Sequence, residues 1–178
     1  MAGKLVQVDH FEISSAVASV IIGGGSSGSS STNFAINTDD VYMVAMNNVV
    51  PVTDSTYLHL RFTESGTPNT TSNYDRANKQ LTAGASFGNA SNTNEDKTEL
   101  TWQQSNTSTL SVQNILYIYN ANNSSEYTFL TLENVGWEKS VGQSMGRAGG
   151  AVFTVTSAVD GVNIFFSSGN IASGTFTL

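Results

Sequence analysis

The sequence contains no cysteine, and this absence removes several kinds of chemistry at once. Without thiols the chain forms no disulfide, offers no thiolate to a metal ion and has no cysteine nucleophile. A chain of 178 residues does not need such cross-links. Folded domains near this length bury roughly 70% of the surface that their unfolded chains expose. We therefore expect residues 1–178 to form a single domain stabilised by its own apolar core.

Basic residues are also scarce. Lys and Arg number 7 against 14 acidic residues, which gives a formal net charge of -7. Binding to phosphate backbones requires clustered Lys and Arg, so the composition argues against a nucleic-acid partner. No apolar run approaches the roughly 20 residues of a membrane-spanning helix, and the first ten residues lack the apolar stretch of an export signal. The sequence therefore predicts no membrane insertion.

The residues that are abundant favour β-structure. Ser, Thr and Asn suit strands joined by hydrogen-bonding turns, and aromatic residues at 10% indicate a packed core. Residues 41–50 are almost continuously apolar, and Pro51 should end that strand. In residues 57–62, Leu58, Leu60 and Phe62 alternate with polar residues, which is typical of a half-buried antiparallel strand.

The second half of the chain has the pattern of a meander. We expect strands over residues 110–119, 127–132, 151–156, 162–166 and 171–178. Residues 120–125 and 168–170 should be turns, residues 142–150 a loop, and Asp160-Gly161 a hairpin signal. Short strands separated by turn residues predict an all-β fold, an antiparallel β-sandwich.

Two segments do not have strand patterns. Residues 23–32 contain only Gly, Ser and Thr, which predicts a flexible loop inside the one domain. Residues 63–109 are mostly polar; within them, residues 74–81 could form one or two helical turns and residues 92–97 a loop. Such a polar region is where lateral or ligand contacts are most easily made.

No constellation of catalytic residues is present. His10 and His59 are far apart in the sequence and lack the spacing of metal ligands, so we interpret both as surface residues. The acid pairs Asp39-Asp40 and Glu95-Asp96 are adjacent, and adjacent strand residues point to opposite faces. The glycine-rich residues 146–150 lack the Lys-Ser/Thr of a phosphate-binding loop. We expect no enzyme activity, no catalytic residue, no cofactor and no metal.

Contact residues are easier to suggest. Trp and Arg are favoured anchors at interfaces, which makes Trp137 with the nearby Arg147 the first candidate contact site and Trp102 the next. The competing interpretation of both tryptophans is packing at the core or its rim. A row formed by Tyr117, Tyr119 and Tyr127 on one sheet face would instead favour a carbohydrate-binding module.

Four blocks of sequence resemble tail-fibre-like and virion structural proteins of marine bacteriophages. The most specific is the closing block FSSGNIASGTFTL, residues 166–178. Weaker blocks are SSAVASV at residues 14–20, DVYMV at residues 40–44 and YIYN at residues 117–120. The resemblance implies a jelly-roll-like β-sandwich located in the virion and assembled in the host cytoplasm. It supplies no catalytic residues.

These observations together predict a non-enzymatic structural protein exposed on a phage particle. A tail fibre or tail-attached appendage involved in host attachment comes first, and a capsid decoration (cement) protein is the alternative. The expected partners are further copies of the chain in a homo-oligomer such as a trimer, other virion proteins and a host surface glycan. A glycan-cleaving enzyme would need an acid pair that the sequence does not offer.

Overall fold

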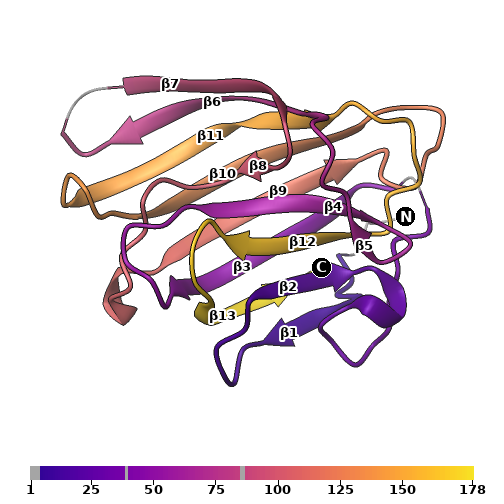
Figure 1. The fold of residues 1–178 in the computed structure, drawn as a ribbon, viewed down its shortest axis with the longest axis horizontal. Coiled ribbons are helices and arrows are strands. Elements are labelled where there is room, and N and C mark those ends of the chain that lie inside the picture. Colours follow the sequence, from indigo (N-terminus) through magenta and orange to yellow (C-terminus); the bar gives the residue numbers. More distant parts are fainter. Residues whose placement is uncertain (1–4, 39, 85–86) are drawn as a thin grey trace.

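The computed structural model describes residues 5–38, 40–84 and 87–178. It consists of two antiparallel β-sheets packed face to face (Figure 1), which confirms the predicted all-β sandwich. The eight-stranded sheet has the order β1-β13-β3-β9-β10-β11-β6-β7, and the five-stranded sheet consists of β2-β12-β4-β5 with β8 paired to β4. The strands of the larger sheet are β1 (His10–Glu12), β3 (Tyr42–Pro51), β6 (Tyr74–Thr82), β7 (Phe87–Glu95), β9 (Val112–Tyr119), β10 (Thr128–Glu138), β11 (Gln143–Phe153) and β13 (Ile171–Thr177). Those of the smaller sheet are β2 (Ser19–Gly23), β4 (Leu58–Glu64), β5 (Thr67–Pro68), β8 (Thr98–Glu99) and β12 (Gly161–Phe166).

The core lies between the two sheets and is built by alternation. In β4, Leu58, Leu60 and Phe62 are fully buried, as their spacing predicts. They share one apolar cluster with buried side chains of β3, β9 and β12. Each fully buried Leu, Ile or Phe contributes about 1.5–3 kcal/mol relative to an exposed one. The predicted strands at residues 41–50 and 110–119 are also confirmed as β3 and β9, and β3 ends at Pro51.

Three segments differ from the prediction. Residues 74–81 form no helical turn but the strand β6, and the predicted loop at residues 142–150 lies mostly in β11. Part of the predicted loop at residues 92–97 belongs to β7. The inward positions of β6 include Arg76, Asn78 and Gln80, so this strand lacks the apolar alternation by which strands are recognised.

Asp160-Gly161 is not the turn of a hairpin, because β11 and β12 belong to different sheets. The chain passes from one sheet to the other at this point, and hydrogen bonds of Asp160 join this connection to β4. Its amide donates to the carbonyl oxygen of Thr63 (2.9 Å), and its carboxylate accepts from the Thr63 hydroxyl (2.6 Å).

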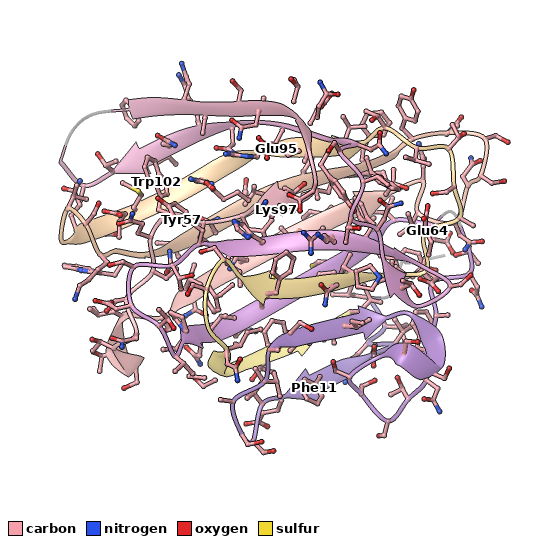
Figure 2. The ribbon with its side chains drawn as sticks, viewed as in Figure 1. Phe11, Tyr57, Glu64, Glu95, Lys97 and Trp102 are labelled. Carbon is pink, nitrogen blue, oxygen red and sulfur yellow. The ribbon has the colours of Figure 1, made fainter. Side chains whose placement is uncertain are left out.

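A segment that follows β7 links the inner side of the larger sheet to the smaller sheet. Its strand β8 pairs with β4, and the amide of Leu100 donates to the carbonyl oxygen of Leu58 (2.8 Å). The carbonyl oxygen of Leu100 accepts from the side-chain amide of Asn134 on β10 (2.7 Å). Trp102, in the same segment, overlies the larger sheet in Figure 2.

The Gly/Ser loop at residues 23–32 is tied to the buried carboxylate of Asp9, which is 1% exposed. This carboxylate accepts from the amide of Gly23 (2.8 Å), from the hydroxyl of Thr32 (2.7 Å) and from the hydroxyl of Ser30. A short 3₁₀ turn, Gly25–Ser27, follows the first of these anchors. Three hydrogen bonds to one carboxylate thus hold both ends of the loop.

Candidate functional site

The outward side of the larger sheet carries a group of exposed apolar side chains. We call the following residues the outer aromatic face: Ile115, Tyr117 and Tyr119 of β9 with Phe129 and Val135 of β10. Four of them are between 42% and 53% exposed, and Tyr119 is half-buried. Because inward and outward residues alternate, the same strands supply the buried Leu116, Ile118, Leu130 and Leu132 to the core.

Strand register brings these side chains together. Tyr119 lies directly opposite Phe129, and Phe129 lies opposite Val152 of β11. Tyr117 lies opposite Thr131, and Thr131 opposite Gly150. Directly opposed residues of antiparallel strands have Cβ atoms about 5 Å apart, so these side chains are neighbours on the face.

Small residues on β11 and β6 leave the surface hollow beside the rings. Gly150 lies opposite Ala77, so neither strand raises a large side chain there. A hollow of about 650 Å³ is lined by Tyr119, Phe129, Ala77 and Val152, with the polar residues Ser91, Asn92 and Thr93 of β7 in its wall. A second hollow of about 560 Å³ is lined by Ile115, Tyr117, Thr131 and Glu133, and it shares Tyr119 and Thr131 with the first. The two hollows adjoin at Tyr119 and Thr131, and we call them together the groove.

Trp137 and Arg147 do not form a joint contact site. Trp137 is a partly buried residue near the end of β10, opposite Ser144 and on the outward side. Arg147 points inward and is only 2% exposed, so it offers no surface to a partner. The expectation of an Arg147 contact site is therefore wrong, because the residue lies on the inward side of β11 beneath the segment that contains Trp102.

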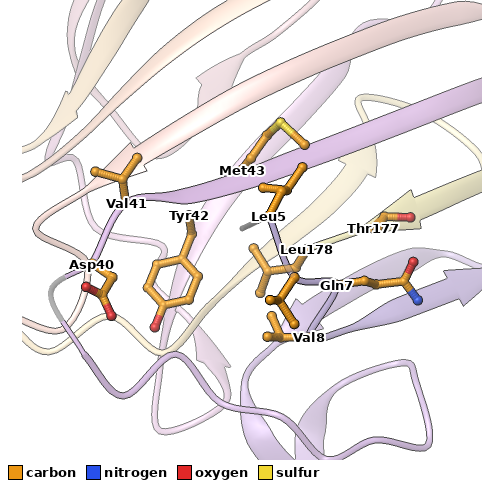
Figure 3. Close-up of a pocket in the computed structure, with 10 residues that line it drawn as sticks. Leu5, Gln7, Val8, Asp40, Val41, Tyr42, Met43, Thr177 and Leu178 are labelled. Atoms are coloured by element: carbon orange, nitrogen blue, oxygen red, sulfur yellow. The ribbon is translucent and has the colours of Figure 1, made fainter. Parts of the chain in front are cut away.

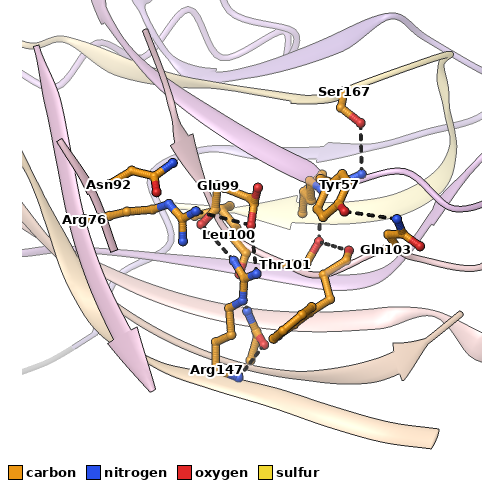
Figure 4. A network of polar contacts seen from close by, with 12 residues as sticks. Tyr57, Arg76, Asn92, Glu99, Leu100, Thr101, Gln103, Arg147 and Ser167 are labelled. Atoms are coloured by element: carbon orange, nitrogen blue, oxygen red, sulfur yellow. Dashed lines mark hydrogen bonds and ion pairs between the residues drawn. The ribbon is translucent and has the colours of Figure 1, made fainter. Parts of the chain in front are cut away.

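Arg147 instead belongs to a polar cluster inside the sandwich (Figure 4). Its guanidinium donates to the carboxylate of Glu99 (2.8 Å) and lies 4.9 Å from the ring centre of Trp102. Arg76 of β6 forms an ion pair with the same carboxylate (3.5 Å). Burial lowers the pKa of Arg147 from its usual value, and the charge of Glu99 opposes that shift. Two arginines around one carboxylate hold the covering segment on β6 and β11, which is a structural role.

His59 is not the surface residue that its polar neighbours in β4 suggest. It is 5% exposed and packs edge-on against Phe165 with ring centres 5.4 Å apart. Burial, followed by the charge of Lys97, lowers its pKa to about 4, so it is neutral near pH 7. His10 is exposed and hydrogen-bonds through Nδ1 to the hydroxyl of Thr177 (3.0 Å).

In the part of the chain that the structure describes, no group of three or more His, Cys, Asp or Glu side chains has the arrangement of a metal site. Asp39 of the first acid pair lies outside the described residues. In the second pair, the carboxylate of Asp96 is bound by Arg61 and by Lys97, and these cations lower its pKa below the usual range. Asp96 therefore does not have the raised pKa of a general acid.

A further hollow of about 510 Å³ lies beside the C-terminal strand (Figure 3). It is lined by residues 5–8 on one side and by Val41, Tyr42 and Met43 on the other, with Leu178 between them. Among the described residues that line it, Asp40 is the only one with a charged side chain, so they do not supply the convergent polar groups of a ligand site.

Of the tyrosines proposed as a row, Tyr117 and Tyr119 do share the outer aromatic face. Tyr127 precedes β10 and lines a separate hollow with Phe129. Sequence reasoning missed Phe129 and Val135, although the alternation Phe129-Leu130-Thr131-Leu132 marks residue 129 as outward once Leu130 is assigned to the core.

No protein-family model, curated protein or solved structure matches this chain. No helix in the described ranges has the length and apolar character needed to cross a membrane.

Proposed function

We propose that this chain is a non-enzymatic structural protein of a bacteriophage virion, exposed on the particle as a tail fibre or tail-attached appendage, and that the outer aromatic face makes its contacts. The observation that carries the contact role is the exposure of Ile115, Tyr117, Phe129 and Val135 together on one face. Contiguous apolar patches are uncommon on monomeric soluble proteins and mark interaction sites. The jelly-roll-like connection of the strands, the homo-oligomer and the location in the virion belong to the proposal and rest on the sequence blocks described above.

The groove favours one partner within this proposal, a host surface glycan. Sugar rings stack their C–H faces on aromatic rings, and Tyr117, Tyr119 and Phe129 offer three rings along the groove. The hydroxyl groups of Ser91 and Thr93 in the wall can hydrogen-bond sugar hydroxyls. This arrangement suits a carbohydrate-binding role that serves attachment. A capsid decoration protein would instead use the same face against the shell.

Attachment is tested by competition. Purified protein should reduce adsorption of the phage to its host in proportion to concentration, and the Tyr117→Ala/Phe129→Ala double variant should lose this effect by about tenfold or more, which equals about 1.4 kcal/mol. Val141→Ala is the matched control, because Val141 is an exposed apolar residue between β10 and β11 and lies off the outer aromatic face.

A particle map separates the alternatives. Density for this sandwich on the tail, with the outer aromatic face pointing away from the particle, is the expected result. Density on the shell with that face turned inward would establish the decoration role. Absence of the chain from purified particles would contradict both.

A further inference from the structure

The outermost strand of the larger sheet, β7, has an uncovered edge. It pairs on one side with β6 and has no strand on its other side in the described part of the chain. Its nine residues span about 30 Å, and alternate residues of an edge strand direct their N–H and C=O groups outward. Such a row of open backbone groups is a template for another strand.

The other three edges of the sandwich are short or covered. On the smaller sheet, the backbone of Ile21 in β2 exchanges hydrogen bonds with Ser29 of the Gly/Ser loop (both 2.8 Å). The outer side of β4 is paired with β5 and β8. At the far end of the larger sheet, β1 is only three residues long and contains His10 and Glu12. Protection of the edge is therefore the rule in this fold, and β7 departs from it.

The composition of β7 also lacks the usual protection. It contains no Pro, Lys or Arg, and Glu95 at its end is its only charged residue. Natural edge strands avoid unwanted pairing by proline, by charge, by shortness, by a β-bulge or by a covering loop. Of these, β7 has a bulge near its end, where Asn94 has a φ of 56° and the register to β6 shifts, and residues 87–92 before it pair regularly. A long, nearly neutral and uncovered strand is instead suited to pairing.

We propose that β7 pairs antiparallel with β7 of a second copy, which joins two eight-stranded sheets into one continuous sheet across a twofold axis. The occupant follows from the edges: among the described residues of a second copy, no edge other than that of β7 is both long and uncovered, so β7 of one copy matches β7 of the other. A pair of like surfaces closes after two copies and does not extend into a fibre. The inference does not depend on the proposed function, because it uses the edge of the sheet and not its outer aromatic face.

A twofold axis permits several registers, and one centred on Ser91 suits the side chains. Ser91 then faces Ser91 and Ala90 faces Asn92 of the other copy, within the regular part of β7. Glu95, the charged residue of the strand, lies beyond the bulge and away from the axis, so no two like charges lie opposite each other. Ser91 and Thr93 also line the groove, so the two grooves would meet at the axis. Pairing along one strand buries little area, which places the expected dissociation constant in the micromolar range.

A charge-swap experiment tests this pairing. Sedimentation velocity from about 1 to 100 µM should show dimers of the unchanged chain, since this range brackets a micromolar dissociation constant. Ser91→Lys and Ser91→Glu each bring like charges together at the axis and should weaken the dimer at least tenfold. An equimolar mixture of the two variants should recover the dimer. Ser14→Lys, at an exposed position after β1, is the matched control and should leave the dimer unchanged.

Two proline variants test whether the backbone makes the contact. Ala90→Pro and Ser91→Pro remove neighbouring amides, one directed to β6 and the other outward. The variant that removes the outward amide should lose the dimer with little change in its thermal unfolding midpoint. The variant that removes the amide directed to β6 should have a lower thermal unfolding midpoint. A monomeric wild-type chain at the highest concentration, or dimers that survive Ser91→Lys and both proline changes, would overturn the proposal. Dimers lost only in Tyr117→Ala/Phe129→Ala would show pairing through the outer aromatic face instead.

Discussion

At the scale of single residues, Glu99 has the largest expected effect on stability. In the described part of the chain, it is the one carboxylate that the inward-pointing Arg147 and Arg76 bind. Glu99→Gln leaves two buried cations without a counter-charge, and breaking a buried pair costs about 3–5 kcal/mol. Because the Glu99 side chain is 23% exposed, we expect about 2–4 kcal/mol in urea unfolding. The control Glu133→Gln, on the outward side of β10, should stay within about 0.5 kcal/mol of the wild type.

His59 should make stability depend on pH. Its folded pKa of about 4 lies below the unfolded value of 6.5, so the unfolded chain binds the proton first. The contribution of His59 is therefore complete above pH 6.5 and is lost as the pH falls toward 4. Between pH 7.5 and pH 5 the loss should be about 2 kcal/mol. His59→Leu, compared with the wild type at both pH values, removes that difference; equal slopes for the two proteins would contradict it.

At the scale of elements, the Gly/Ser loop depends on a residue outside it. The composition of residues 23–32 predicts a flexible loop, whereas the structure ties that loop to Asp9. Asp9→Ala should release it, and a broad-specificity protease should then cleave within residues 24–32 well before the rest of the chain. The wild type and the control Glu126→Ala, in the exposed turn before β10, should resist at the same protease concentration.

The elements that could be read from the sequence are those with a clean apolar alternation, such as β4 and β9. The others escaped for physical reasons. Both faces of β7 are exposed, so its sequence has no alternation of apolar and polar residues. In β6 the inward positions are filled by Arg76 and Asn78, which lie under the covering segment. Glycines of β11 suggested a loop, although Gly150 supplies the floor of the groove.

The residues of the candidate site also include some that the sequence could place and others that it could not. Tyr117 and Tyr119 could be placed on one face because their strand alternates. The burial of Arg147 could not be predicted, because its glycine and alanine neighbours give no sign of which side of β11 faces the core. Its stacking partner Trp102 is 45 positions earlier in the chain and reaches it only through the strand pairing of the folded protein.

At the scale of the whole molecule, the first and last strands of the structure pair with each other, and one side chain of that pair lies in the core. Phe176 of β13 is fully buried and lies between Phe11 of β1 and Met46 of β3 in the pairing of the sheet. Phe176→Ala should destabilise the fold by about 3–5 kcal/mol, since the cavity is surrounded by three strands. The exposed Phe129→Ala is the control and should unfold near the wild-type midpoint. A loss below about 1 kcal/mol for Phe176→Ala would contradict the central place of this residue.

The pairing of β13 with β1 and β3 also has a consequence for synthesis. Of the strands in the described residues, β13 is synthesised last, so β1 remains without the strand that it pairs with there while more than 150 residues are added. During that interval one side of β3 stays open beside apolar residues such as Met46 and Val49. Strand edges left open in a growing chain are the places where off-pathway pairing begins. The nascent protein thus carries its greatest aggregation risk until β13 has emerged.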